Sequence, residues 1–252
     1  MKDELITRHE KLGGTKLEKF YSWLNSIYQS YYNAIVPEKR YLLYLDGIKI
    51  TILISLLAIA LGVVIGVIVA VVKVSANNSK MKWLSKICNL YTTVVRGTPL
   101  VIQLLIIYNL VFNSRSTNAI IVGAVCFGFN SGAYVAEIIR AGIESIDRGQ
   151  MEAGRSLGLN HVKTMRLIIL PQAIKNILPA LGNEFIVLIK ETSVASYISV
   201  VDLTAAAHLV ASRTYDILPP LIIIALCYLI MTMGLTKILS IFERRLARGD
   251  RH

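Results

Sequence analysis

The sequence predicts an all-α membrane protein with five transmembrane helices, and three observations support that fold class. The chain of 252 residues is 54% hydrophobic, with a mean hydropathy of +0.57, so it is more apolar and less charged than a soluble domain. Several apolar runs approach the ~20 residues that a helix needs to cross a bilayer. Basic residues form three clusters on alternate loops, as cytoplasmic segments do. The clusters are Lys73, Lys80, Lys82 and Lys86; Arg140, Arg148, Arg155, Lys163, Arg166 and Lys175; and Lys237, Arg244, Arg245, Arg248 and Arg251.

Five spans place all three basic clusters on one side, with the N-terminus outside and the C-terminus in the cytoplasm. The formal charge of +11 first suggests a nucleic-acid partner, but the charges lie where membrane topology requires them, so no nucleic acid is expected. Three isolated cysteines and four scattered histidines predict neither a disulfide framework nor a metal site. The first forty residues lack the apolar core of a signal peptide.

Residues 1–40 form an N-terminal arm whose second half shows helical periodicity. Apolar residues from Phe20 to Ile35 recur at helical spacing, with polar residues on the other face. This pattern predicts an amphipathic helix lying in the membrane interface, and a helix packed on its own protein is an equal alternative. Tyrosines are expected in the interfacial aromatic belt. They are Tyr28, Tyr32, Tyr41 and Tyr44.

The first span is expected over 48–74 and the second from Arg96 to about residue 112. Gly62 and Gly66 form a GxxxG pair, which is either a close-packing face or, more simply, a chance pair in an apolar helix. Thr98 is a good N-cap and Pro99 suits the first helical position, so they mark the start of the second span. The polar turn at 113–118 is expected outside.

The third span is expected over 119–139 and carries an acidic residue. Asn130, Tyr134 and Glu137 recur on one helical face. An acidic side chain within a span costs roughly 2.5–3.5 kcal/mol, so Glu137 should face a partner or a wet cavity. An equally good interpretation is a structural pair between Glu137 and Arg140.

The fourth span is expected over 177–200, with Glu184 and Glu191 on one face. Thr192 and Ser193 follow Lys190 and Glu191 in a polar break, which is tolerated at membrane depth where the backbone lines a cavity or is buried in protein. We interpret this break as part of a translocation pathway, and an internal Lys190–Glu191 ion network is the alternative. A mixed outer loop at 202–220 leads to the last span, over 221–242.

The stretch 149–173 is polar, basic and punctuated by helix signals. Gly149 is a candidate N-cap, Gly158 is suited to a left-handed residue that ends the first helix, and Asn160 caps a second helix. Pro171 is expected to stop that second helix. The pattern predicts a rigid helix–Gly–helix elbow on the cytoplasmic side, which is built to dock a partner.

The elbow also resembles the EAA signature of the transmembrane subunits of type I ABC importers. Glu152-Ala153-Gly154, Gly158 and the Ile168-x-Leu170-Pro171 run match that signature in spacing, and only Gly154 departs, where alanine is usual. The RGTP-L-x-x-Q run from Arg96, the block at 131–143 and the Lys190–Ser193 element are similar to polar amino-acid permeases of the histidine, glutamate, glutamine, arginine and opine family. Gly47, Thr51 and Ser55, at the start of the first span, are similar to the same family of permeases. The resemblance covers about 47–245 and not the arm.

This resemblance implies a type I permease domain at 41–247, with a coupling loop at 147–171 and a cytoplasmic tail at 248–252. It implies that the chain is a non-enzymatic permease subunit in a bacterial or archaeal cytoplasmic membrane, with ATP and magnesium on partner ABC ATPase subunits and no cofactor of its own. Further expected partners are membrane lipid, a second permease copy or paralogue, and an extracytoplasmic amino-acid-binding protein. The expected ATPase contacts are Glu152, Ala153, Gly154, Arg155, Gly158 and Leu159. The expected pathway residues are Asn130, Tyr134, Glu137, Glu184, Glu191, Thr192 and Ser193.

A self-sufficient ion- or proton-coupled amino acid carrier is the alternative function, with Glu137 or Glu191 as the relay. Five spans without an inverted repeat disfavour it. No phosphate-binding loop occurs in the sequence, so ATP hydrolysis is expected on another chain. Glu137, Glu184 and Glu191 favour a cationic amino acid, while glutamine, glutamate and cystine stay open.

Overall fold

The computed structural model describes residues 16–75, 82–111 and 118–248, and all regular secondary structure in these ranges is helical. The predictions for the start of the N-terminal arm, for Lys80, for the outer turn at 113–117 and for the tail at 249–252 lie outside the described residues. The elements are α2 (Lys16–Ile35), η1 (Pro37–Lys39), α3 (Tyr41–Ser75), α4 (Lys82–Gly97), α5 (Leu100–Val111), α6 (Ala119–Glu144), α7 (Arg148–Ser156), α8 (His161–Thr164), η3 (Met165–Ile169), α9 (Leu170–Glu191), η4 (Thr192–Ile198), α10 (Leu203–Thr214) and α11 (Leu218–Arg248).

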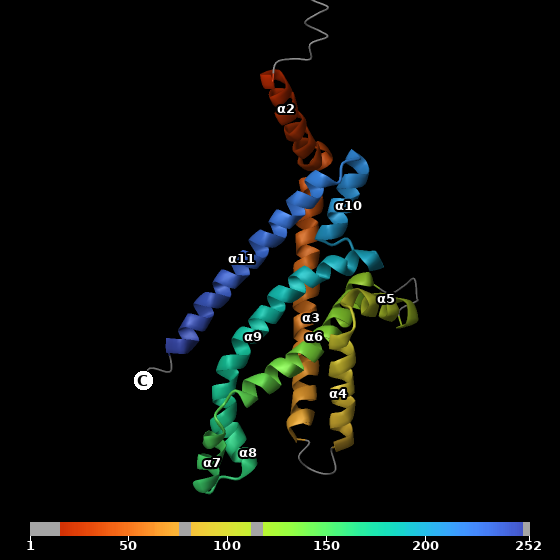
Figure 1. Ribbon diagram of the computed structural model, residues 1–252. Helices are drawn as coiled ribbons and strands as arrows, with labels where there is room; N and C mark the ends of the chain where they lie inside the picture. Colours follow the sequence, from red (N-terminus) through yellow and green to blue (C-terminus); the bar gives the residue numbers. More distant parts are fainter. Residues whose placement is uncertain (1–15, 76–81, 112–117, 249–252) are drawn as a thin grey trace, which may run out of the picture.

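Figure 1 shows a bundle organised around α3, with α6 and α9 crossing it and α11 running obliquely along one side. The short helices α7 and α8 lie at one end of the bundle, the end at which α3 finishes and α4 begins, and α2 lies at the opposite end. The α2 helix confirms the helical periodicity predicted for the arm. Tyr44 was predicted in the aromatic belt, but it is buried and its hydroxyl donates to the carbonyl of Ala34, so that prediction was wrong.

Three helices are long and apolar enough to cross a membrane, and the number becomes five if each of two bent helix pairs counts as one span. The three are Pro37–Val74, Ala119–Glu144 and Leu218–Leu246. The bent pairs are Lys82–Gly97 with Leu100–Leu110, at 111°, and His161–Ile198 with Leu203–Thr214, at 52°. The five-span prediction is therefore met only by counting the broken segments.

The helix predicted to start at Pro99 is present as α5, but it has only 12 residues and meets α4 at a sharp turn at Thr98-Pro99, so it forms a span only together with α4. Proline lacks an N–H donor and disfavours helical backbone in the residue before it, so α4 ends at Gly97. Thr98 does not act as an N-cap: its hydroxyl donates to the carbonyl of Val94, and α5 begins one residue after Pro99. The side-chain amide of Gln103 donates to the backbone carbonyls of Val95 and Thr98 at 2.6 and 3.0 Å, and these two bonds hold the bend between α4 and α5.

The predicted outer loop at 202–220 was also wrong, because most of it is α10. Asp202 is the N-cap of this helix and accepts a hydrogen bond from the Ala205 amide at 2.9 Å. The break before α10 docks on α3: an added Cβ at Gly47 would lie 2.7 Å from the Cα of Leu203, and the Thr51 hydroxyl accepts from the Leu203 amide. Gly47 and Thr51 of α3 therefore hold the break between η4 and α10 in place.

A close helix contact joins α3 to α6 through two interlocked GxxxG pairs. On α3, a Cβ at Gly62 would meet the Ser131 side chain at 3.0 Å, and one at Gly66 would meet Val135 at 2.5 Å. On α6, Cβ atoms at Gly128 and Gly132 would in turn meet side chains of α3 at 2.8 and 2.7 Å. Small residues let the two backbones approach, so the GxxxG pair on α3 is a packing face and not a chance pair.

Candidate functional site

The elbow between α6 and α9 is a rigid, capped unit at one end of the bundle (Figure 1). Asp147, and not Gly149 as predicted, is the N-cap of α7, and its carboxylate accepts from the Gly149 amide at 2.6 Å. Aspartate provides a side-chain acceptor for the first free amides, which glycine lacks. Asn160 caps α8 as predicted, accepting from the Lys163 amide at 2.8 Å.

Gly158 adopts the left-handed backbone predicted for the residue that ends the first elbow helix. Its φ is +83°, and nothing lies within 4 Å of where a side chain would begin. The Gly158 and Leu159 amides donate to the carbonyls of Arg155 and Gly154 at 3.0 and 3.1 Å, which satisfies carbonyls at the end of α7. The elbow angle therefore depends on a residue that tolerates positive φ.

Pro171 does not stop the second elbow helix, so that prediction was wrong. The chain continues from α8 through a π-helical turn, η3, into α9, and the Leu170 amide donates to the carbonyl of Met165 five residues earlier. Pro171 lies in the first turn of α9, where the wide preceding turn accommodates a residue without an N–H. A single helical rod therefore connects the elbow to the middle of the bundle.

The predicted ATPase contacts divide into an outer face and a buried packing residue. Glu152, Ala153, Arg155 and Gly158 are exposed, and Leu159 is half-buried. Leu157 and Val162 add apolar surface, at 81% and 71% exposure. An exposed mixture of apolar and charged side chains on a stiff elbow is suited to docking a protein.

Gly154 alone among the predicted contacts is buried, because it packs against the second elbow helix. A Cβ there would lie 2.5 Å from the Thr164 Cγ2 atom and 3.0 Å from the Ile168 Cδ1 atom. Thr164 is fully buried, and its hydroxyl donates to the carbonyl of Asn160, so this side chain has little room to move. Glycine at this position lets α7 lie directly on α8 and η3.

Replacing Gly154 with alanine should loosen the elbow, although alanine favours helix by about 1 kcal/mol. Overpacking a tight contact costs about 1–3 kcal/mol, so the balance is unfavourable. We expect amide hydrogen exchange in the peptide containing Leu159, whose amide bonds the Gly154 carbonyl, to be several-fold faster. Adding Thr164→Ser removes the clashing methyl and should restore slow exchange. Gly97→Ala, with open space around it, is the control, and unchanged exchange in Gly154→Ala would contradict this close packing.

The predicted pathway residues on α6 and α9 form two separate groups. In the upper group, the Asn130 amide donates to the Gln103 side-chain oxygen at 3.0 Å, and the Ser131 hydroxyl donates to Glu184 at 2.7 Å. Glu184 is only 8% exposed. The upper group therefore joins α5, α6 and α9 by polar contacts inside the bundle.

The polar break after Lys190 is present, and its residues face different surroundings. The helix changes from α9 to the tighter η4 at Thr192, as the break predicted. Thr192 is buried and its hydroxyl donates to the Ile189 carbonyl, whereas Ser193 lines an open cavity of about 980 Å³ beside α10. In the described part of the chain, no salt bridge joins Lys190 to Glu191, so the ion network proposed for them is not formed there.

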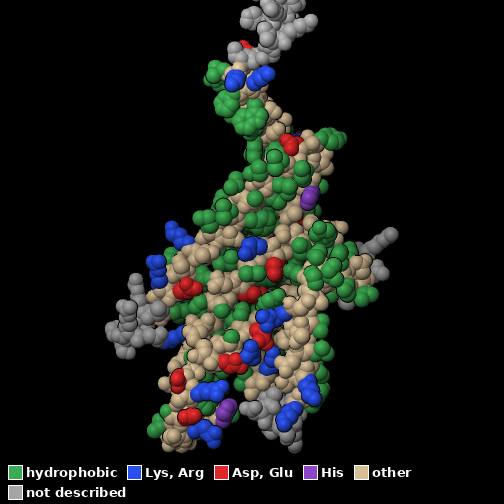
Figure 2. All heavy atoms as spheres, in the orientation of Figure 1, with side chains coloured by type: hydrophobic (Ala, Val, Ile, Leu, Met, Phe, Trp, Pro, Cys, Tyr) green, Lys and Arg blue, Asp and Glu red, His purple; other side chains and the backbone are tan. Residues whose placement is uncertain are grey.

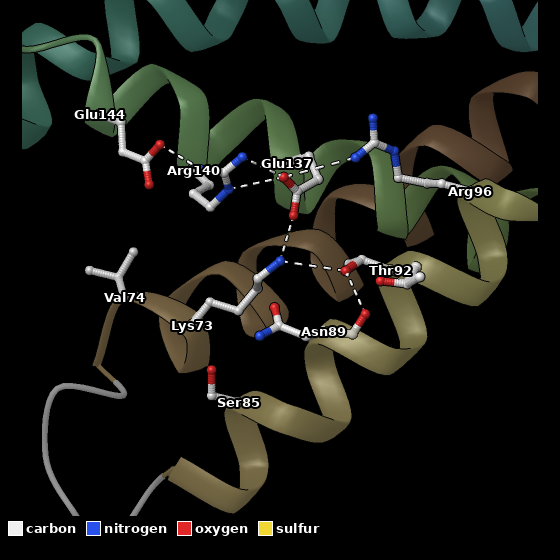
Figure 3. Close-up of a pocket in the computed structure, with 10 residues that line it drawn as sticks. Lys73, Val74, Ser85, Asn89, Thr92, Arg96, Glu137, Arg140 and Glu144 are labelled. Atoms are coloured by element: carbon white, nitrogen blue, oxygen red, sulfur yellow. Dashed lines mark hydrogen bonds and ion pairs between the residues drawn. The ribbon is translucent and has the colours of Figure 1, made fainter.

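Glu137 lies in the lower group, in a cluster of charges from three helices (Figure 3). Its carboxylate forms ion pairs with Lys73 of α3, with Arg140 at 2.8 Å and with Arg96 of α4 at 3.9 Å. The side chains of Lys73 and Glu137 are 11% and 17% exposed. Tyr134 lies beneath the Arg96 guanidinium, with its ring centroid 5.3 Å away. The Glu137–Arg140 pair considered from the sequence is therefore formed, and Lys73 and Arg96 join it.

A cavity of about 590 Å³ opens beside this cluster, between α3, α4 and α6. In Figure 2, basic and acidic side chains gather on the face over the lower parts of these helices. No helix was predicted from the sequence over 82–97, so the α4 side of this site was missed. The signal was present as Ser85, Asn89, Thr92 and Arg96, which recur on one helical face opposite exposed apolar residues.

Comparison with known proteins places the chain among components of transport systems. The sequence profile of the family described as "Binding-protein-dependent transport system inner membrane component" matches residues 62–248. The chain is 44% identical over 173 residues to the putative glutamine transport system permease protein GlnP of Rickettsia bellii, covering 67% of this chain and 78% of the relative. It is 38% identical over 224 residues to the arginine transport system permease protein ArtQ of Bacillus subtilis, covering 87% and 98%. A crystal structure of an amino acid ABC transporter with histidines is similar at a TM-score of 0.77 and 47% identity, covering 82% of this chain and 95% of that one.

Proposed function

The chain belongs to the family of binding-protein-dependent transport system inner membrane components, and from this membership we propose that it translocates an amino acid. It is a multi-pass membrane permease of an ABC import system. The relatives named above carry glutamine and arginine in their descriptions, which supports an amino acid as the cargo. This membership replaces the stand-alone carrier considered from the sequence.

The observation that carries the proposal is the geometry of the elbow. Its caps, its left-handed Gly158 and its continuity with α9 make it stiff, while Glu152, Ala153 and Arg155 stay exposed. We propose that each elbow docks on a partner ATPase, which binds ATP and magnesium. ATP-driven closure of two ATPases would then move the elbows and, through α9, switch the access of the pathway between two states.

The proposed assembly holds two permease chains, either two copies or one copy and a paralogue, with an amino-acid-binding protein outside. The elbow, Lys73 and the end of α6 are proposed to lie on the cytoplasmic side, with the C-terminus on that side and the N-terminus outside. The proposed permease domain runs over 41–247, behind an arm at 1–40.

The acidic residues of the pathway differ in what they offer a substrate. Glu137 has three basic partners, so its charge is compensated within the chain. Glu184 accepts from the neutral Ser131 hydroxyl, and neither Glu184 nor Glu191 has a salt bridge among the described residues. Carboxylates that lack a salt bridge inside a membrane bundle favour a cationic ligand. We propose that Glu184 and Glu191 select a cationic amino acid.

Uptake into proteoliposomes tests this proposal. The chain would be reconstituted with its co-expressed ATPase and binding protein, and uptake of labelled arginine and labelled glutamine measured with and without ATP. We expect ATP-dependent uptake that prefers arginine, and a loss of that preference in Glu191→Gln because the substrate cation loses its carboxylate. Glu243→Gln, near the end of α11, is the matched control.

Each other outcome rejects a defined part of the proposal. Gradient-driven uptake without the ATPase would reject the ABC mechanism in favour of a carrier. ATP-dependent uptake that prefers glutamine in both the unmodified chain and Glu191→Gln would reject the cationic selectivity and leave the importer.

A further inference from the structure

The cavity between α3, α4 and α6 has a lining suited to a charged small molecule. All its lining residues among the described part of the chain are polar or charged except Val74. Lys73, Arg96 and Arg140 face Glu137 and Glu144, which gives the lining a formal charge of +1. Its volume of about 590 Å³ lies within the ~300–1,000 Å³ of ordinary ligand sites. The upper group around Glu184 contributes no residue to it.

The charges alternate in sign along the cavity, as Figure 3 shows. Glu144 bonds one end of the Arg140 guanidinium, and Glu137 bonds the other end at 2.8–2.9 Å. Glu137 then pairs with Lys73, whose ammonium also donates to the Thr92 hydroxyl. Arg140, Glu137 and Lys73 are therefore the middle of the row, where Glu137 forms an ion pair with each of the two basic side chains.

The two ends of the row are more exposed than its middle. Arg96 reaches Glu137 only at 3.9 Å, and its side chain is 45% exposed. Glu144 is 59% exposed, and among the described residues its carboxylate is bonded only by Arg140. The cavity thus presents one exposed cation, Arg96, at the end nearer the bundle centre and one exposed anion, Glu144, at the end nearer the elbow, where Glu144 shares the Arg140 guanidinium with Glu137.

The spacing of these two groups points to a particular ligand. The Arg140 guanidinium and the Glu137 carboxylate lie between them, so they are much farther apart than the carboxylate and ammonium on one Cα atom. A long cationic side chain separates its charge from the α-carboxylate by several bonds. We propose that the cavity binds a free amino acid with such a side chain, with the α-carboxylate on Arg96 and the side-chain cation on Glu144.

This site rests on the proposed amino acid import and deepens it. Glu144 lies at the last residue of α6, beside the elbow, so the cavity lies on the exit side of Glu184 and Glu191. An amino acid that has left the bundle centre meets it next, and cytoplasmic amino acid reaches it from the other direction. The cavity is therefore a site for released product, in which a carboxylate binds a planar guanidinium in the geometry that arginine favours.

Protection of an introduced thiol measures occupancy of the cavity without requiring transport. Ser85, in the lining, would be replaced by cysteine in the assembled transporter carrying Cys88→Ala and Cys227→Ala, which leaves the buried Cys126. The rate of modification by a charged thiol reagent would be measured with arginine, with lysine and with glycine. We expect arginine and lysine to slow modification about tenfold at a concentration about ten times their Kd, and glycine to leave it nearly unchanged.

Matched variants test whether protection of the Ser85→Cys thiol depends on Arg96 and Glu144. Protection should be lost in Arg96→Gln and in Glu144→Gln, and retained in Arg244→Gln and Glu243→Gln, which make the same changes on α11. It should also persist in Glu191→Gln, because that residue is outside the cavity. Protection that survives both cavity variants, or that is lost in Glu191→Gln, would overturn the site.

Uptake measured in the same liposomes separates the two proposals. Uptake of arginine without any protection of the Ser85→Cys thiol would reject the exit-side site and leave the proposed function. Protection by arginine in a chain that imports no amino acid would reject the proposed function and leave the binding site. Equal protection by glycine would overturn the requirement for a long cationic side chain.

Discussion

Replacing Gly66 with leucine is expected to destabilise the folded bundle strongly. A Cβ at this position would lie 2.5 Å from the Val135 Cγ1 atom and 3.0 Å from the backbone nitrogen of Ala136, which cannot rotate away. Overpacking of this kind costs about 3 kcal/mol or more, a large part of a stability of about 5–15 kcal/mol. Thermal unfolding of the purified chain should shift down by about 10 °C, and the yield of monodisperse protein should fall.

Gly234→Leu on α11 is the matched control, because nothing lies within 4 Å of the point where its side chain would begin. It places the same residue in another apolar helix and should leave the unfolding temperature nearly unchanged. A Gly66→Ala variant should be destabilised less, and adding Val135→Gly should recover part of the loss by moving the small residue to the facing helix. Equal unfolding temperatures for Gly66→Leu and Gly234→Leu would refute the interlocked packing of α3 and α6.

Replacing Gly158 with valine is expected to uncouple transport from ATP while the chain still folds. A β-branched residue is an outlier at a φ of +83°, and the strain is about 1–3 kcal/mol. The strain falls on the elbow alone, because no residue beyond the two chain neighbours of Gly158 lies within 4 Å of the point where the side chain would begin. The first elbow helix would lose its angle to the second, and ATP-driven uptake should fall about tenfold or more.

Gly158→Asn separates backbone strain from the loss of glycine itself. Asparagine tolerates the left-handed region, so this variant should keep most of the ATP-driven uptake although it carries a larger side chain than alanine. The unfolding temperature of the asparagine variant should match that of the unmodified chain, and the valine variant should lose only about 2–10 °C and stay folded. If valine and asparagine reduce uptake equally, the ATPase contact excludes any side chain at this position, and positive φ is not the cause.

The intrinsic preferences of single residues predicted most of the elbow correctly. They gave a wrong prediction where the conformation of a residue depends on the surrounding structure. Gly158 and Asn160 have the structures that their intrinsic preferences dictate. Pro171 does not, because a π-helical turn before it removes the clash that usually ends a helix. The same limit explains Gly62 and Gly66, since a glycine pair becomes a packing face only when another helix carries its own small residues opposite it.

The sequence allowed Glu137 to be predicted as a site residue, but it did not show which side chains Glu137 contacts. Glu137 was found because an acid in an apolar run is costly, yet two of its three partners come from α3 and α4, far away in the chain. Helix α4 was missed because its polar face, which lines the cavity, makes the sequence read as a polar loop. Mean hydropathy averages the side chains around a helix, so it does not show which face of the helix is polar and exposed to water.

The long helix α3 also fixes where the bilayer lies along the molecule. Between Lys49 and Lys73 it has 23 consecutive residues without a charge, which rise about 35 Å, close to the ~30 Å thickness of a hydrocarbon core. Lys73 and its partner Glu137 therefore mark a boundary of the hydrocarbon, where ions keep part of their hydration. Below that boundary the lower end of α6, the elbow and the mouth of the charged cavity operate in water, within reach of soluble proteins and metabolites.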